Sequence, residues 1–227
     1  MNDISYSFPV LQVALDVEEL VKAVDIATSI VTRTTCRNLW IEVGTPLLKA
    51  WGKIAIKALK NLTKCFVVAD TKSIDVPNIE AKIVYSAGAD AFTVLGISDI
   101  ETIKEAVSAA REHGKKIIVD LIECREPYSR ALEIARLEPD VILFHVGISV
   151  QKARGVSAEV LVEEAAKVKS ELGVRVAVAG GLKPGRIRPL IEKGIDIVIV
   201  GSAITSSPDP ASTATEILRE IGISIEF

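Results

Sequence analysis

The sequence predicts a single α/β domain over residues 1–227, folded as a (β/α)8 barrel of the TIM type. Short runs rich in Val, Ile and Leu alternate with segments of helical period from end to end of the chain. Nearly half of the residues (49%) are hydrophobic and only 4% are aromatic, which is typical of parallel strands buried on both faces. Glycine corners follow the last two expected strands, where barrels commonly bind phosphate.

Eight strands are expected at spacings that suit a βα repeat. The segment after the first of them, LDVEEL, lacks the G-x-G-x-x-G pattern of a dinucleotide-binding sheet, which favours a closed barrel over an open doubly wound sheet. Residues 1–10 are expected to form an N-terminal extension, to which the sequence assigns no role. The expected strands are 11–15, 39–43, 65–70, 91–95, 116–120, 141–145, 174–178 and 196–200.

Charge and composition exclude several functional classes. A net charge of −3 argues against a nucleic-acid-binding protein, although a pocket with local positive potential could still bind a small anion. The N-terminus lacks the layout of a signal peptide, and no apolar run approaches a membrane span, so we expect a cytoplasmic protein without a membrane partner. We interpret Cys36, Cys65 and Cys124 as reduced thiols of an intracellular protein.

Polar side chains stand at the carboxyl ends of the expected strands, which converge on one mouth of a barrel. Glu42 interrupts an apolar strand, and a buried carboxylate needs a cation or hydrogen bonds. If the third strand is regular, Asp70 and Lys72 point to the same face, because residues i and i+2 do so in a strand. Together these positions indicate a polar pocket in an apolar scaffold. The full set is Asp16, Glu42, Asp70, Lys72, Asp120 and His145.

Each of these residues also has a purely structural interpretation. Asp16 is equally suited to cap the helix that follows it. Asp70 and Lys72 could form a structural ion pair, and a lone histidine such as His145 is usually a core or surface residue. We interpret Asp120 as structural.

Two glycine corners predict an anion site. Gly180 and Gly181 follow the seventh strand, and Gly201 and Ser202 follow the eighth. Without a Cβ in the way, backbone N–H groups can approach phosphate oxygens closely, and a short helix beginning near Ser202 would add its positive end. The alternative is a tight turn that binds no ligand.

The segment VVADTKSIDVPNIEA contains Asp70, Lys72 and Asp75 in the D-x-K-x-x-D pattern that resembles the orotidine-monophosphate-decarboxylase superfamily. The resemblance extends from LQVALD through IEVGTPLLKA and FHVGIS to AVAGG and IVIVGSAI. Within that superfamily the chain is most similar to the 3-hexulose-6-phosphate synthases, which join formaldehyde to ribulose 5-phosphate reversibly through an enediolate. Glu42 stands where the orotidine-monophosphate decarboxylases have a lysine, and those enzymes use no metal.

The resemblance implies a role for each site residue. Glu42 and Asp70 would bind Mg²⁺, Lys72 would stand beside the developing oxyanion, and His145 would transfer the proton. Asp75 would reach across the interface of a homodimer into the partner's site. The substrate would be bound by Asp16 at a sugar hydroxyl and by Gly180, Gly181, Gly201 and Ser202 at the phosphate.

Three other functions stay open. A 3-keto-L-gulonate-6-phosphate decarboxylase shares the chemistry, but that branch tends to have an arginine near the strand-six histidine, and none stands here before Arg154. An orotidine-5'-phosphate decarboxylase is disfavoured by Glu42. A sugar-phosphate-binding barrel without catalysis is kept open by Ser149, which replaces the Asp of the family's usual H-x-G-x-D pattern.

Overall fold

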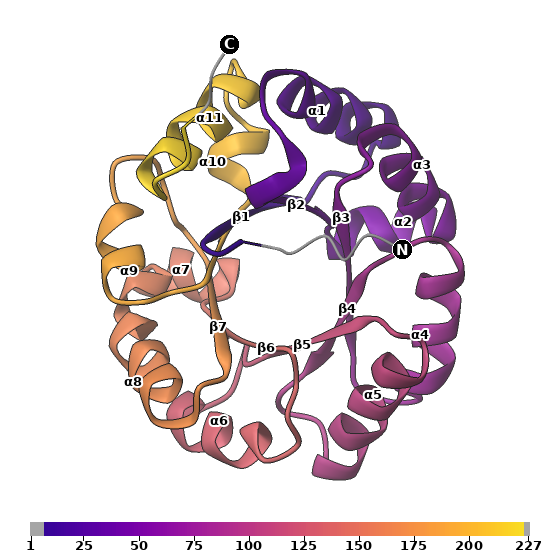
Figure 1. Cartoon of the computed structure of the whole chain (residues 1–227), viewed down its shortest axis with the longest axis vertical. Helices are drawn as coiled ribbons and strands as arrows, with labels where there is room; N and C mark the ends of the chain where they lie inside the picture. The colour runs from indigo at the N-terminus through magenta and orange to yellow at the C-terminus, as the bar shows by residue number, and fades with distance from the viewer. Residues whose placement is uncertain (1–6, 225–227) are drawn as a thin grey trace.

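The computed structural model describes residues 7–224. Its eight parallel strands follow one another in chain order and close into a barrel, as predicted (Figure 1). Four strands have the predicted bounds, and three others differ from them by one residue. The strand that was predicted at 65–70 continues to Ser73. The strands are β1 (Val10–Leu15), β2 (Leu39–Val43), β3 (Phe66–Ser73), β4 (Ala91–Leu95), β5 (Lys116–Asp120), β6 (Val141–His145), β7 (Arg175–Ala179) and β8 (Ile197–Val200).

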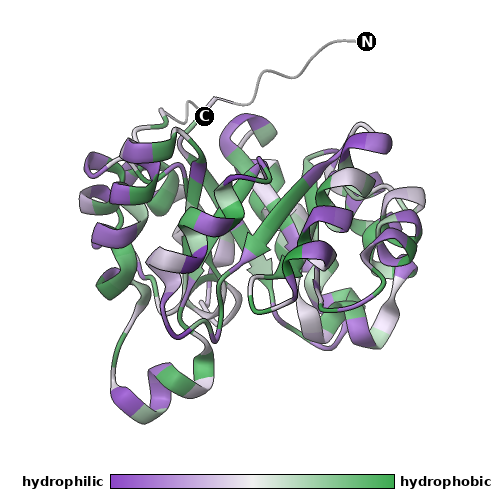
Figure 2. Ribbon diagram, turned by 90° about the horizontal axis from the view of Figure 1, so that it is seen from below, coloured by the Kyte–Doolittle hydropathy of each residue, from purple (hydrophilic) through white to green (hydrophobic). Residues whose placement is uncertain are grey.

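The helices form a ring around the barrel and turn their apolar faces to the strands (Figures 1 and 2). In the described part of the chain, none is long and apolar enough to cross a membrane. Two 3-10 turns, η1 (Cys36–Asn38) and η2 (Ala158–Leu161), precede β2 and α8. The helices are α1 (Leu20–Arg33), α2 (Thr45–Trp51), α3 (Lys53–Thr63), α4 (Pro77–Ser86), α5 (Ile100–Glu112), α6 (Pro127–Ala135), α7 (Ile148–Arg154), α8 (Val162–Leu172), α9 (Arg188–Glu192), α10 (Ser202–Thr205) and α11 (Pro210–Glu220).

Strand alternation divides the core into two layers. Residues that face outward from the strands pack against the helices, whereas a second cluster fills the barrel itself. Side chains alternate across a strand, so the residue two places after an inward-facing one also faces inward. The polar residues at the carboxyl ends of several strands therefore lie on the same inner face as the apolar cluster. Val68 is thus followed on the inside by Asp70, Ile118 by Asp120, and Leu143 by His145.

The amino ends of the strands are closed by aromatic packing. The Trp40 ring stacks on Phe66 at 4.1 Å between centroids, and the Phe8 ring meets Trp40 edge-on at 6.2 Å. The Arg175 guanidinium lies 3.8 Å from the centre of the Phe8 ring. Part of the expected N-terminal extension therefore has a role, because Phe8 covers this end of the barrel and Val10 begins β1. Residues 1–6 of that extension lie outside the described residues.

The expectation of three reduced thiols is wrong for two of them. Cys36 in η1 and Cys65, just before β3, form a disulfide with their Cα atoms 4.9 Å apart. The two strands that follow these cysteines, β2 and β3, are paired, so the cysteines are neighbours despite 29 residues of separation in sequence. Cys124 is free.

Candidate active site

Four charged side chains form a connected network at the carboxyl ends of the strands. Lys72 Nζ lies 2.9 and 2.8 Å from the two carboxylate oxygens of Asp70, and 3.2 Å from Asp120 Oδ2. His145 Nδ1 lies 3.0 Å from the same oxygen of Asp120. Asp120 therefore joins His145 to the pair formed by Lys72 and Asp70, which links three of the predicted site residues.

Asp120 is central to this network, and its interpretation as a merely structural residue missed that position. Its side chain is completely buried, and Ile122 N–H donates to Oδ1 at 2.9 Å. Burial by itself raises the pKa of Asp120, but His145, Lys72 and this hydrogen bond together lower it to about 2. A signal was present in the sequence, because Asp120 ends its expected strand as Asp70 and His145 end theirs.

Lys72 reaches Asp70, although not through a regular strand. The register between β3 and β4 shifts between Ala69 and Ser73, and Lys72 has a φ of +47° in the left-handed region. Burial by itself lowers the pKa of Lys72, but the charges of Asp70 and Asp120 and the hydrogen bond to Asp70 raise it above its ordinary value. Lys72 is thus held as a cation within an acidic cluster.

The Asp70 carboxylate is oriented by two hydroxyl groups that sequence reasoning missed. Thr45 Oγ1, at the start of α2, donates to Oδ2 at 2.5 Å, and Thr93 Oγ1, on β4, donates to Oδ1 at 2.9 Å. Both oxygens also face Lys72. The carboxylate therefore has little rotational freedom.

Glu42 is buried, with 6% of its surface exposed, and it does interrupt an otherwise apolar strand. Its Oε2 accepts a hydrogen bond of 2.8 Å from the Gln12 amide on β1, a partner that the sequence did not reveal. Burial first, and then the carboxylates of Asp70 and Asp16, raise the pKa of Glu42 well above its ordinary value. The Gln12 hydrogen bond and the charge of Lys72 lower this pKa, but they do not offset burial and the neighbouring carboxylates.

This donor set suits a hard divalent cation. Two carboxylates, Glu42 and Asp70, supply oxygen ligands, and a cation between them would relieve the repulsion that raises the pKa of Glu42. No group of three His, Cys, Asp or Glu residues in the described chain is arranged to bind a metal by protein ligands alone. Any such ion would complete its shell with water or substrate oxygens, as Mg²⁺ usually does.

The interpretation of Asp16 as a helix cap is wrong. The residue that precedes α1 is Glu19, and the helix has no side-chain cap there. The Asp16 carboxylate instead lies between two glycines, since a Cβ on Gly44 would come within 2.2 Å of Oδ1 and one on Gly201 within 3.2 Å of Oδ2. Burial and the nearby charge of Asp70 raise the pKa of Asp16. This carboxylate adjoins both the acidic cluster and the corner after β8.

The two glycine corners flank the network. Gly180 and Gly181 have φ values of 118° and 71°, and a Cβ on Gly180 would lie 2.3 Å from the Val146 carbonyl oxygen, next to His145. Gly201 leads directly into the short helix α10, which begins at Ser202 as expected. Glycine is needed at 180 for the turn itself, so phosphate binding at these corners stays a prediction.

Asp75 does not join the network within one chain. Its side chain is exposed, and its Oδ1 accepts the N–H of Val76 at 2.9 Å. A role for Asp75 in the site of a partner chain stays a prediction.

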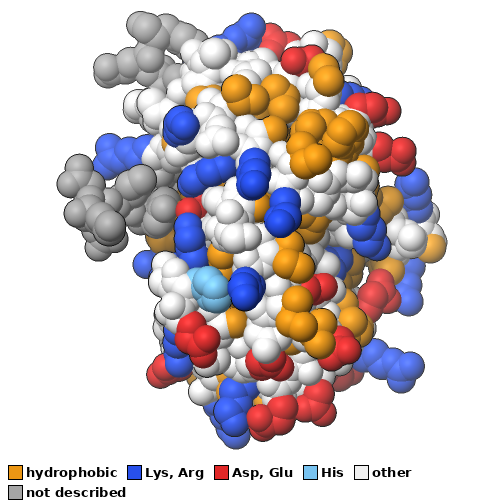
Figure 3. Space-filling view, turned by 90° about the vertical axis from the view of Figure 1, so that its right-hand side faces the viewer, with side chains coloured by type: hydrophobic (Ala, Val, Ile, Leu, Met, Phe, Trp, Pro, Cys, Tyr) orange, Lys and Arg blue, Asp and Glu red, His pale blue; other side chains and the backbone are white. Residues whose placement is uncertain are grey.

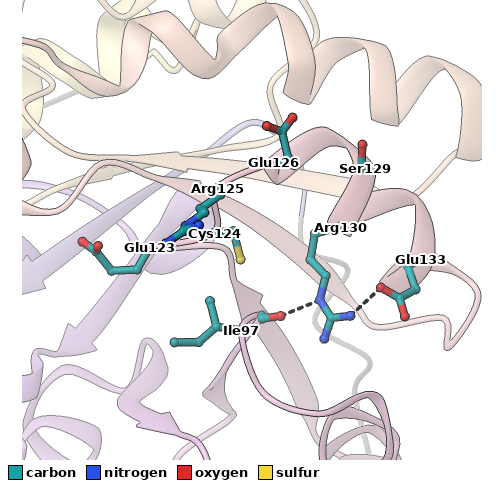
Figure 4. Close-up of a pocket in the computed structure, with 9 residues that line it drawn as sticks. Ile97, Glu123, Cys124, Arg125, Glu126, Ser129, Arg130 and Glu133 are labelled. Carbon is teal, nitrogen blue, oxygen red and sulfur yellow. Dashed lines mark hydrogen bonds and ion pairs between the residues drawn. The ribbon is translucent and has the colours of Figure 1, made fainter.

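A cavity of about 480 Å³ opens beside the network, between the segments that follow β4 and β5 (Figure 4). Its wall includes Ile97, Cys124, Arg125 and Arg130. The Arg130 guanidinium donates to the carbonyl oxygens of Gly96 and Ser98 at 2.6 and 2.5 Å, and so ties the two segments together. None of the four charged residues of the network lines this cavity.

The chain is similar in sequence and in fold to several known proteins. A 3-hexulose-6-phosphate synthase from Mycobacterium gastri is 35% identical over 212 residues, which cover 93% of this chain and 99% of the relative. The crystal structure of 3-hexulose-6-phosphate synthase from Salmonella typhimurium has a TM-score of 0.86 and 36% identity, over 93% of this chain and 98% of that one. The crystal structure of 3-keto-L-gulonate-6-phosphate decarboxylase from Vibrio cholerae has a TM-score of 0.80 and 26% identity, over 95% and 98%.

Residues 9–217 match the family model described as Orotidine 5'-phosphate decarboxylase / HUMPS family. This match covers most of the chain and includes every predicted site residue. The chain belongs to the Orotidine 5'-phosphate decarboxylase / HUMPS family.

Proposed function

We propose that this protein is a 3-hexulose-6-phosphate synthase, which adds formaldehyde to ribulose 5-phosphate in a reversible aldol reaction. The observation that carries the proposal is the network of Lys72, Asp70, Asp120 and His145 beside the buried carboxylate of Glu42. The relatives that cover nearly all of this chain at 35–36% identity bear the same name.

The network suits a reaction that removes a proton from carbon and develops charge on oxygen. Removal of a proton from C1 of ribulose 5-phosphate gives an enediolate, and C1 then forms a bond to the carbon of formaldehyde, whose oxygen takes up a proton. Lys72 offers a fixed positive charge for the developing oxyanion, because Asp70 and Asp120 hold its Nζ in place. The reverse reaction breaks the same bond and releases formaldehyde.

His145 is suited to carry the proton in both directions. We assign its Nδ1 proton to the hydrogen bond with the Asp120 carboxylate, which leaves Nε2 to act on the substrate. Asp120 thereby fixes the ring and its tautomer, and it remains ionised because its pKa is about 2. One His145 ring can thus accept the proton from C1 and return it to the new alkoxide.

Glu42 and Asp70 would hold Mg²⁺, which supplies positive charge to adjacent substrate oxygens when bound. Gln12, Thr45 and Thr93 orient these two carboxylates, so that their oxygens are presented before any ion arrives. We further propose that the sugar is bound by a hydroxyl contact to Asp16 and by backbone donors at Gly180, Gly181, Gly201 and Ser202 to its phosphate.

The proposed enzyme is a homodimer in which Asp75 completes the partner's site. Exposed apolar side chains lie on both sides of Asp75 in the sequence, on the segment after β3 and on α4, and Figure 3 shows hydrophobic side chains gathered on this side of the molecule. Ile74, Ile79 and Ile83 are 57%, 55% and 44% exposed. Such a surface is expected to be covered by another chain. Sedimentation velocity of the Ile79→Lys variant tests this, because a monomer is expected in place of the dimer.

Formaldehyde consumption with ribulose 5-phosphate, measured with Mg²⁺ and with chelator, tests the proposed activity. We expect consumption that depends on the metal and is abolished by Lys72→Ala. Lys60→Ala is the matched control, because Lys60 pairs with Asp90 at 2.5 Å just before β4, at the opposite end of the barrel. The control variant should keep wild-type activity.

The same experiment separates the other functions. Release of carbon dioxide from 3-keto-L-gulonate 6-phosphate, without formaldehyde consumption, would assign the chain to the decarboxylase branch. Binding of ribulose 5-phosphate that is unaffected by chelator, with no turnover of either substrate, would indicate a barrel without catalysis. Wild-type activity in Lys72→Ala would refute the role of the network.

A further inference from the structure

The network contains an irregularity in the sheet. Ala69 pairs with Phe92 and Ser73 pairs with Val94, so β3 advances four residues while β4 advances two. The extra residues of β3 fall in the stretch that carries Asp70 and Lys72. A lysine with a φ of +47° is strained, and such a conformation persists only where its surroundings hold it.

Thr93 lies opposite this irregularity and bonds to both functional residues. Its Oγ1 accepts the backbone N–H of Lys72 at 2.8 Å and donates to Asp70 Oδ1 at 2.9 Å. Its carbonyl oxygen accepts the hydroxyl of Thr71 at 2.6 Å. Thr93 is only 2% exposed, so water has little access to replace these bonds.

The direction of these bonds is fixed by chemistry. A hydroxyl group has one hydrogen, and the Lys72 amide can only donate, so the hydrogen of Thr93 Oγ1 is directed to Asp70. The single hydroxyl therefore joins the backbone of Lys72 to the carboxylate that its own Nζ contacts. Loss of the hydroxyl would leave a buried N–H without a partner and free one side of Asp70.

We propose that the Thr93 hydroxyl is a positioning element that holds the strained backbone of Lys72 and the carboxylate of Asp70 in one reactive arrangement. The expected effect on kcat rests on the proposed function. The expected effect on the Lys72 backbone rests on the hydrogen bonds alone. Thr93 acts through Lys72 and Asp70.

Three variants separate the hydroxyl from the shape of the side chain. Thr93→Val keeps the shape and removes the hydroxyl, whereas Thr93→Ser keeps the hydroxyl and removes a methyl group. Thr93→Ala differs from Thr93→Ser by the hydroxyl alone, and it provides the comparison if the valine variant does not fold. Urea unfolding of each full-length variant establishes that it is folded before the other measurements.

The first measurement is kcat and KM for ribulose 5-phosphate. We expect Thr93→Val and Thr93→Ala to lower kcat by about 10- to 100-fold, because misplacement of a reacting group by about 1 Å can cost a factor of that size. KM should change by less than about threefold, since the phosphate and sugar contacts are left in place. Thr93→Ser should keep kcat within about threefold of wild type. Wild-type kcat in the valine variant, or equal losses in the serine and alanine variants, would overturn the proposal.

The second measurement is hydrogen exchange at the Lys72 amide, followed by NMR, which does not depend on turnover. Exchange should be at least about tenfold faster in Thr93→Val and Thr93→Ala, and close to wild type in Thr93→Ser. Equal exchange in all four proteins would overturn the proposal. If the wild-type protein consumes no formaldehyde, the proposed function fails, and the exchange rates alone decide whether Thr93 holds Lys72.

Discussion

Replacement of Asp120 by asparagine tests the electrostatic account of the site quantitatively. The pKa of Asp120 is about 2 in the folded protein, against about 3.9 for an unperturbed aspartate. A difference of this size contributes about 3 kcal/mol to the free energy of unfolding at pH 7. Asp120→Asn removes that contribution while keeping nearly the same shape. The variant should therefore be less stable by about 3 kcal/mol at neutral pH.

The stability difference between wild type and Asp120→Asn should also depend on pH. Because the pKa is lowered on folding, the contribution is fully present well above pH 3.9 and is lost as the pH falls through 2. The stability difference between wild type and Asp120→Asn should therefore shrink to roughly half of its value at neutral pH when it is measured at pH 3. Urea unfolding at pH 7, 5 and 3 measures it, and Glu101→Gln is the control. Glu101 forms an exposed pair with Lys104, which is worth less than about 1 kcal/mol.

Two results would refute this account. Unchanged stability of Asp120→Asn at pH 7 would mean that the charges of Lys72 and His145 do not stabilise the Asp120 carboxylate. A stability difference that stays constant down to pH 3 would mean that the loss comes from packing and not from ionisation. Either result would also remove the reason for treating Asp120 as the group that fixes His145.

Three further changes have defined outcomes. Gln12→Met should weaken Mg²⁺ binding about 10- to 100-fold in calorimetry, because it removes the hydrogen bond that orients the Glu42 carboxylate; an unchanged Kd would contradict this. The raised pKa of Glu42 makes the stability of the metal-free protein fall as the pH rises above about 4.3, so Glu42→Gln should raise the Tm at pH 8 more than at pH 5. Replacement of Cys36 and Cys65 by serine opens a loop of 29 residues and should lower the free energy of unfolding by about 3–4 kcal/mol in urea, whereas Cys124→Ser should not.

The fold was predictable because the barrel repeats one local pattern. Each strand is a short apolar run between turn signals, and four of the eight bounds were predicted without error. The third strand was predicted to end at Asp70, where polar residues begin, but it continues to Ser73. Past its apolar part, the strand is held to β4 by hydrogen bonds that Thr93 accepts from the Thr71 hydroxyl and the Lys72 N–H, and hydrophobic periodicity does not report such bonds.

The candidate site was predictable only where a side chain's place at a strand end was enough. Glu42, Asp70, Lys72 and His145 were identified from that placement and from the resemblance to a known family. Partners such as Gln12 and Thr93 could not be identified in this way, because they depend on which strands are neighbours and on their register. The disulfide was missed for the same reason, since Cys36 and Cys65 come together only when β2 pairs with β3.

Several unfavourable features of this protein lie together at the carboxyl end of the barrel. Glu42 and Asp16 have raised pKa values, so their ionised forms are less stable here than in water. Lys72 has a strained backbone, and the buried Gln12 leaves its carbonyl oxygen without a partner. A chain selected for stability alone would have replaced these residues. Their joint presence therefore argues, independently of any relative, that this layer is the site of the proposed reaction.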